Sequence, residues 1–171
     1  MNFEKLPKDL LIPKDDGACD HLKNFIIPSI ALSNQDGYKL KLNRSDTFRI
    51  VLYCYPMTGS PNKKLPSNWD VIPGARGCTA ETCSIRDNYD EIVTLNAIPI
   101  GISTQSIIDI KEMVVRLNIT HDVLSDINLE FAKKLKLPTF KIDKIVFFEK
   151  IDINYRKINY KKGILSYFST R

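Results

Sequence analysis

The chain has 171 residues, of which 43% are hydrophobic and 26% are charged, and its net charge is +5. This length and composition are typical of one soluble globular domain with a core of its own. The lysine pairs are scattered along the chain, which argues against a nucleic-acid partner. No signal-like segment opens the sequence, and no run approaches the roughly 20 apolar residues of a membrane span. We therefore expect a cytoplasmic protein without a membrane partner.

The first part of the chain predicts an irregular arm, a hairpin and a buried strand. Residues 1–24 are rich in Pro, Asp and Lys and precede a predicted domain at 25–171. The stretch IPSIALSNQDGYKLKLN alternates around the turn NQDG, which predicts a β-hairpin. TFRIVLYCY, at 47–55, is β-branched and aromatic throughout, as in a strand that is buried on both faces. Four prolines and three glycines follow within 22 residues, so we expect 57–77 to be a long loop, and loops of this length are usually functional or disordered.

A second set of elements follows this loop. Apolar residues recur at helical spacing from Cys78 to about Leu95. AIPIGIS predicts another buried strand, and Ser103 or Thr104 would cap a helix that runs to about Asn118.

The remaining segments complete the predicted fold. HDVLSD predicts a short strand and INLEFAKKLKL a helix that ends before Pro138. KIVFFEKIDINY and KINYKKGILSYF predict two strands that are joined near Arg156 and Lys157. This order of elements predicts an α/β domain whose sheet is parallel at its centre and antiparallel at one edge.

Two cysteines, Cys78 and Cys83, lie where the first long helix is predicted to begin. The unpaired amides and the dipole at a helix N-terminus stabilise a thiolate. Together with neighbouring cations they lower a cysteine pKa from roughly 8.5 towards 3.5–7.5. Arg76 is close in sequence, and Lys150 or Arg116 would approach from elsewhere. We therefore expect Cys78 to be a reactive thiolate.

The neighbours of Cys78 suit attack on a small oxidant. Gly77 permits unusual backbone angles and close access to the thiol, and Thr79 offers a hydroxyl beside it. A thiolate that attacks a peroxide becomes a sulfenic acid, which a nearby thiol condenses into a disulfide. Cys83 is the candidate for that second thiol.

The spacing of the two cysteines has a mechanical consequence. On an ideal helix, Cα atoms five residues apart are about 8–9 Å from each other, whereas a disulfide needs them within about 7 Å. Resolution by Cys83 therefore requires the first turns of the helix to unwind. From the spacing alone, two small buried core residues would be the favoured alternative, because free cysteine is among the most buried residue types.

The segment GCTAETCSIRD resembles the active-site segment GCT-x-E-x-C-x-FRD of peroxiredoxins in the bacterioferritin-comigratory (PrxQ) group. FRIVLYCYP is similar to the central strand of that family, which ends in an active-site proline. AIPIGISTQS and HDVLSDINLEFAKKLKL resemble its V-x-GVS-x-DS and LLSD segments. The resemblance covers roughly 27–155.

This resemblance implies a thioredoxin-like fold, with a central mixed β-sheet flanked by helices. It implies reduction of hydrogen peroxide or organic hydroperoxides, with recycling by thioredoxin or a similar dithiol, and no metal, flavin or haem cofactor. Cys78 would be the peroxidatic and Cys83 the resolving cysteine, and Pro56 would shield the thiolate. Glu81 would help to hold the site. Monomers occur in this group, so we expect a monomer or a weak dimer.

Two positions depart from the family pattern. The family has a threonine three residues before the peroxidatic cysteine, where this chain has Ala75, so Thr79 or Thr58 would have to supply the hydroxyl. Lys150 aligns with a distant family arginine, and lysine keeps the charge but loses the planar fork. Because of these departures, an alternative function stays open, namely a catalytically weak module that senses peroxide or binds a partner.

Other readings of the remaining residues are weaker. A disulfide oxidoreductase is disfavoured because the chain lacks a C-x-x-C motif, and zinc is disfavoured because His21 and His121 lack paired ligand spacing. Cys19 and Cys54 are expected to be core residues. Trp69 would either present a partner surface or pack the loop at 57–77 against the domain, and packing is the favoured prediction.

Overall fold

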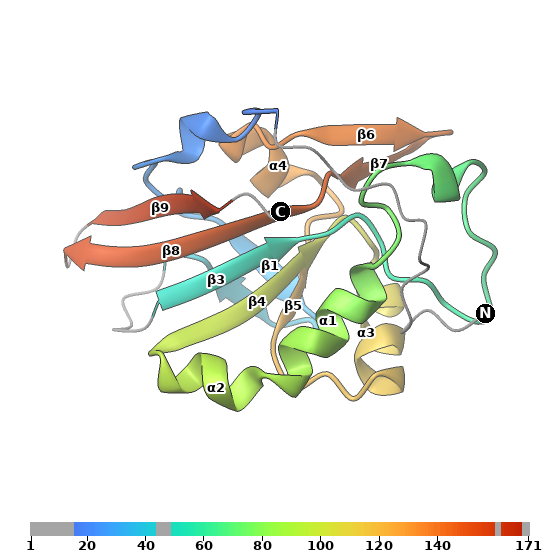
Figure 1. Cartoon of the computed structure of the whole chain (residues 1–171), viewed down its shortest axis with the longest axis horizontal. Coiled ribbons are helices and arrows are strands. Elements are labelled where there is room, and N and C mark those ends of the chain that lie inside the picture. The colour runs from blue at the N-terminus through green and yellow to red at the C-terminus, as the bar shows by residue number, and fades with distance from the viewer. Residues whose placement is uncertain (1–15, 44–48, 160–161, 169–171) are drawn as a thin grey trace.

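The computed structural model describes residues 16–43, 49–159 and 162–168. A seven-stranded sheet in the order β2-β1-β5-β4-β3-β8-β9 forms the centre of the described fold (Figure 1). The three parallel strands are β3 (Arg49–Cys54), β4 (Ala97–Ser103) and β5 (Val123–Ser125). Antiparallel strands flank them, namely β1 (Ala31–Asn34), β2 (Lys39–Lys41), β8 (Ile151–Asn159) and β9 (Lys162–Phe168). The predicted mixed sheet with a parallel centre is confirmed.

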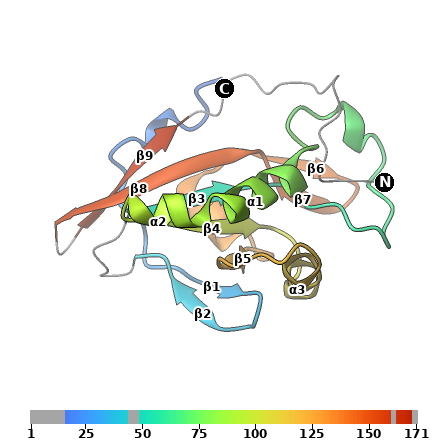
Figure 2. The same ribbon diagram turned by 60° about the horizontal axis from the view of Figure 1, so that its bottom comes forward.

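Helices cover both faces of this sheet. Ile50 and Leu52 of β3 belong to the core cluster that includes Phe131 of α4 (Glu130–Leu135). Tyr53 follows Leu52, faces the other side of the strand and belongs to a second cluster with Cys78 of α1 (Cys78–Asp87) and with residues of α3 (Ile107–Arg116). Figure 2 shows α1 and α2 (Tyr89–Thr94) following each other along this face. Burial on both faces explains why the strand is a continuous apolar run.

The predicted N-terminal hairpin is confirmed. β1 pairs antiparallel with β2, and Gly37 in the connecting turn has a φ of +86°. The Asn34 side chain accepts hydrogen bonds from the amides of Asp36 and Tyr38, at 3.1 and 3.0 Å. A 3-10 helix, η1 (Asp20–Leu22), precedes the hairpin. The irregular arm at 1–24 stays a prediction, because residues 1–15 lie outside the described residues.

Two helices differ from their predicted bounds. The segment from Cys78 to Leu95 is two helices, because the backbone leaves the helical region at Asn88, with φ −105° and ψ 15°. The N-cap of α3 is Ser106, whose hydroxyl accepts a hydrogen bond from the amide of Asp109 at 3.2 Å. The prediction that Ser103 or Thr104 caps this helix is therefore wrong. Ser103 is still part of β4. None of the described helices is long and apolar enough to cross a membrane.

The C-terminal strands were predicted with the wrong connections. KIVFFEKIDINY is not one strand, because β7 (Ile145–Phe148) ends before Glu149 and pairs with β6 (Thr139–Ile142), a strand that was not predicted. β8 continues past the predicted junction, and within its ladder with β9 Arg156 is paired with Ile164. Residues 160–161, between β8 and β9, lie outside the described residues.

The loop at 57–77 is packed against the β6–β7 pair. It contains a 3-10 helix, η2 (Trp69–Val71), and Trp69 is buried. The Trp69 ring centroid lies 5.1 Å from that of Phe147 and 6.0 Å from that of Phe140. The predicted packing role of Trp69 is confirmed, and the loop is thereby fixed beside the start of α1.

Candidate active site

Cys78 begins α1 and is almost completely buried, with 1% of its surface exposed. Gly77 precedes it with a φ of +102°, a conformation that L side chains rarely adopt. The predicted need for an unusual backbone angle at Gly77 is therefore confirmed. The Cys78 thiol donates a weak hydrogen bond to the carbonyl of Ala75, with the sulfur 3.6 Å from the oxygen.

The expectation that the pKa of Cys78 is lowered is wrong for this conformation. Burial, followed by the negative charge of Glu81, raises the pKa of the Cys78 thiol to about 12. The backbone amide of Met57 and the Lys150 ammonium act in the opposite direction but are outweighed. Removal from water opposes the charged form more strongly than the backbone amides of Met57 and Cys78 and the Lys150 cation favour it. Cys78 is thus a protonated thiol near neutral pH.

Glu81 and Lys150 form an ion pair next to this thiol. The Lys150 Nζ lies 3.1 Å from Glu81 Oε1, and the side chains are 21% and 15% exposed. The pair joins α1 to the connection between β7 and β8. The structure therefore brings Lys150, which is far away in the sequence, next to Cys78 and Glu81. The charges of Glu81 and Lys150 have opposite effects on the pKa of the Cys78 thiol.

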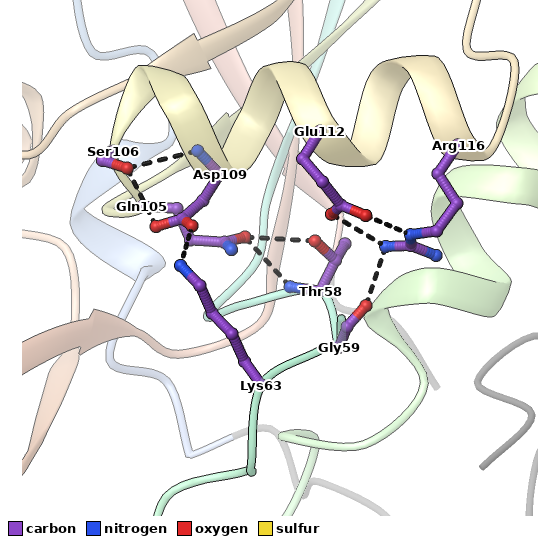
Figure 3. A network of polar contacts seen from close by, with 8 residues as sticks. All are labelled: Thr58, Gly59, Lys63, Gln105, Ser106, Asp109, Glu112 and Arg116. Carbon is purple, nitrogen blue, oxygen red and sulfur yellow. Dashed lines mark hydrogen bonds and ion pairs between the residues drawn. The ribbon is translucent and has the colours of Figure 1, made fainter. Parts of the chain in front are cut away.

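The other candidate cations are bound elsewhere. Arg76 forms an ion pair with Asp70 of η2, within the loop at 57–77. Arg116 is bound to Glu112, with 2.6 Å between Nε and Oε1, and it donates to the carbonyl of Gly59 at 2.9 Å (Figure 3). A role for Arg76 in stabilising charge at Cys78 stays a prediction.

Cys83 lies on the same uninterrupted helix as Cys78, and both side chains are buried thiols. The first turns are held by the amide of Glu81, which donates to the Gly77 carbonyl at 2.9 Å, and by the Thr82 hydroxyl, which donates to the Cys78 carbonyl at 2.9 Å. A disulfide between the two cysteines therefore requires these bonds to break.

Thr58 does not supply a hydroxyl to Cys78 in this structure. Its amide and its hydroxyl both donate to Gln105 Oε1, at 3.0 and 3.2 Å (Figure 3). Ser103 donates to the carbonyl of Pro56 at 3.1 Å, so the buried Pro56 is held from the end of β4. Thr79 is buried beside Cys78, and its catalytic role stays a prediction.

Tyr55 is a site residue that the sequence analysis missed. Its side chain is completely buried in the cluster that contains Cys78 and Cys83, and its hydroxyl has no hydrogen-bond partner among the described residues. Burial raises the Tyr55 pKa well above its usual value, the charges of Tyr53, Cys78 and Glu81 raise it further, and the neighbouring Ser103 side chain lowers it. The signal was present in the sequence, because alternation along YCYP turns Tyr53 and Tyr55 to the same face.

Tyr53 and His121 form a buried pair next to Tyr55. The rings of Tyr53 and Tyr55 stack with centroids 5.7 Å apart. The Tyr53 hydroxyl lies 2.6 Å from His121 Nε2, and His121 Nδ1 has no partner among the described residues. Burial lowers the pKa of His121 to about 4, although Asp122 acts in the opposite direction.

The other cysteines lie apart from this cluster. Cys19 and Cys54 are buried in the core cluster on the opposite face of the sheet, as predicted. Within the described ranges, no three or more His, Cys, Asp or Glu side chains are grouped so that they could hold a metal ion.

Comparison of the sequence with known proteins finds relatives of one kind. The sequence profile of the AhpC/TSA family matches residues 71–156, half of the 171 residues. Chloroplastic peroxiredoxin Q of Triticum aestivum is 26% identical over 117 residues, which are 68% of this chain and 47% of that protein. Peroxiredoxin Bcp of Escherichia coli strain K12 is 32% identical over 79 residues, which are 46% of this chain and 41% of that protein. The chain thus spans less than half the length of these two relatives.

Solved structures share the fold. Peroxidoxin BcpB from Mycobacterium tuberculosis superimposes with a TM-score of 0.63 at 19% identity, over 86% of this chain and 87% of the other. A bacterioferritin comigratory protein from Xanthomonas campestris, studied for its alkyl peroxide reduction activity, gives a TM-score of 0.62 at 13% identity, over 94% and 87% of the two chains. The predicted thioredoxin-like fold is confirmed by these likenesses.

Proposed function

Because this chain belongs to the AhpC/TSA family, as a peroxiredoxin of the bacterioferritin-comigratory and PrxQ group, we propose that it is a thiol peroxidase. Its substrates are hydrogen peroxide and organic hydroperoxides, and Cys78 is the nucleophile. One observation carries the proposal: the Cys78 thiol begins α1, beside the Met57 amide and the Glu81–Lys150 ion pair.

The first step forms a sulfenic acid. The Cys78 sulfur attacks the terminal oxygen of the hydroperoxide, an S–O bond forms, and the O–O bond breaks. The proton that Cys78 loses ends on the departing oxygen, which leaves as water or an alcohol. Lys150 and the Met57 amide stabilise the negative charge that develops on the reacting oxygens, and Thr79 and Tyr55 are the hydroxyls beside them.

The second step joins the two cysteines. The Cys83 sulfur attacks the sulfenic sulfur of Cys78, so a disulfide forms and water is released. α1 unwinds over its first turns to allow this approach. A dithiol donor such as thioredoxin then reduces the disulfide and restores both thiols, and a cytoplasmic location would supply such a reductant.

Intact-mass spectrometry after one equivalent of hydrogen peroxide tests both steps. The wild-type chain is expected to lose two hydrogens. The Cys83→Ser chain is expected to gain one oxygen as a trapped sulfenic acid, and Cys78→Ser is expected to show neither change. A Cys78→Ser protein that consumed peroxide at the wild-type rate would refute the assignment of the nucleophile.

The burial of Cys78 supports a second candidate function, a peroxide sensor that reacts once and turns over slowly. A protonated, water-excluded thiol reacts more slowly than an exposed thiolate. Steady-state peroxide consumption with a thioredoxin system separates the two candidates. Repeated turnover supports the peroxidase, whereas a single stoichiometric oxidation supports the sensor.

A further inference from the structure

A hollow of about 570 Å³ lies between the loop at 57–77, the start of α3 and the β6–β7 pair. This volume is in the range of sites for small organic molecules, roughly 300–1,000 Å³. Much of its lining is apolar and includes Leu65, Leu129 and Phe147. Two further lining residues, Ile127 and Ile145, are 56% and 57% exposed. Large apolar side chains at an accessible rim are typical of a site that binds apolar groups.

The lining also contains a buried hydroxyl that no other group satisfies. Thr104 follows β4 and is 7% exposed, and its Oγ1 has no hydrogen-bond partner among the described residues. A buried hydroxyl without a partner destabilises the folded state. A ligand with an acceptor oxygen would satisfy this hydroxyl.

The charges around the hollow favour an anion. Both acidic lining residues are already bound to cations: Asp109 to Lys63, and Glu112 to Arg116 (Figure 3). Lys64 and Lys144 also line the hollow, and neither has an ion pair with another described residue. The net effect is a positive rim on an apolar cavity.

We propose that this hollow is a binding site for an amphipathic monocarboxylate, with an aliphatic or aromatic body on the apolar lining. The carboxylate supplies an acceptor oxygen for the Thr104 hydroxyl and a negative charge for Lys64 and Lys144, which have no such partners among the described residues. Binding here does not depend on the peroxidase activity, because neither cysteine lines the hollow.

Octanoate is a suitable probe, and Trp69 is a suitable reporter. Trp69 is the only tryptophan of the chain, and it contacts Phe147 of the lining edge-on. Octanoate is expected to change the Trp69 fluorescence in a saturable way, with one site by calorimetry. Octan-1-ol is expected to bind about fivefold more weakly, because it lacks an ion pair worth up to about 1 kcal/mol.

Two exposed isoleucines give a matched pair of variants. Ile145→Glu places a negative charge in the lining, and we expect it to weaken octanoate binding about tenfold or more. Ile108→Glu makes the same change on α3 at a residue that is 82% exposed and outside the lining, so binding is expected to be unchanged.

Thr104→Val tests the hydroxyl and is expected to weaken octanoate binding while leaving octan-1-ol less affected. Melting curves establish that each variant is folded before binding is compared. The proposal is overturned if octanoate does not bind saturably to the wild type. It is also overturned if octan-1-ol binds equally well, or if the two glutamate variants bind alike.

Discussion

At the scale of the residue, Tyr55 brings a phenol hydroxyl to a site whose family pattern expects a threonine. The family threonine is replaced by Ala75, and Thr58 is bound to Gln105. Tyr55 is completely buried in the same cluster as Cys78, and its hydroxyl has no partner among the described residues. Apart from its interaction with the neighbouring Ser103 side chain, this hydroxyl is available to donate to a reacting peroxide oxygen.

We therefore expect Tyr55→Phe to lower the second-order rate constant for peroxide about tenfold or more, as for the loss of one hydrogen bond to a charged group. The melting temperature is expected to stay constant or rise, because the variant removes a buried hydroxyl without a partner. Stopped-flow kinetics and thermal melting measure the two effects. Tyr53→Phe is the control, since it breaks the bond to His121 and should destabilise the fold. An unchanged rate in Tyr55→Phe would exclude the role.

The raised pKa of Cys78 predicts a distinctive pH dependence. Because burial raises this pKa to about 12, the thiolate fraction and the rate of alkylation should increase about tenfold per pH unit between pH 6 and 9. Glu81→Gln removes a charge that raises the pKa, so its alkylation should be faster at every pH in this range. Iodoacetamide labelling of Cys78, followed by mass spectrometry, measures both. A plateau above pH 7 in the wild type would contradict the raised pKa.

The sequence predicted part of this site. The motif and the family resemblance alone predict the glycine before Cys78 and the presence of Lys150 near the thiol. The direction of the Cys78 pKa shift did not follow, because it depends on how much water the loop at 57–77 excludes and on which cations are bound elsewhere. Arg76 illustrates the difficulty: it is two residues from Cys78, yet it pairs with Asp70.

At the scale of the element, α1 holds both cysteines in a conformation that cannot form their disulfide. We expect Ala80→Gly, between the two cysteines, to ease unwinding by roughly 1 kcal/mol. Disulfide formation would then be up to about fivefold faster, while the initial attack on peroxide is unchanged. Rapid-quench mass spectrometry separates the two steps. Ser84→Gly is the control, because Ser84 lies beyond Cys83 on the exposed side of the helix. If Ser84→Gly accelerated disulfide formation equally, local unwinding between the two cysteines would be contradicted.

Element boundaries were predicted less well than element types. Hydrophobic periodicity continues across Asn88 and conceals the break between α1 and α2. The β6–β7 pair was missed because its two strands have four residues each and mixed exposure. The two-residue connection, in which Asp143 has a φ of +53°, was the available signal, since aspartate is favoured in such turns.

At the scale of the whole molecule, the buried His121 links folding to pH. The folded-state pKa is about 4, below the usual 6.5, so the unfolded chain binds a proton first as the pH falls. The contribution of His121 is therefore fully present above pH 6.5 and is lost as the pH falls towards 4, by about 3 kcal/mol. Urea unfolding of the wild type and of His121→Phe between pH 7 and 4 measures this. Parallel curves for the two proteins would contradict the prediction.

The overall topology was the most predictable level. Two buried apolar runs, separated by helical periodicity, require a parallel pair in the centre of a sheet, and the pairing of β3 with β4 follows. Hydrophobic periodicity did not predict the position of the loop at 57–77. The loop packs through contacts of Trp69 with Phe140 and Phe147, which belong to the β6–β7 pair, and that pair was not predicted from the sequence.

Met57 faces two environments at once. Its backbone amide favours the Cys78 thiolate, while its side chain packs with the Trp69 cluster and the residue lines the apolar hollow. A residue shared by two sites couples them where binding at one site changes its position, and such linkage is reciprocal. If a carboxylate in the hollow shifts the ionisation of Cys78, then ionisation of Cys78 must change the affinity for that carboxylate by the same factor. The occupancy of the hollow would then report the protonation state of the thiol.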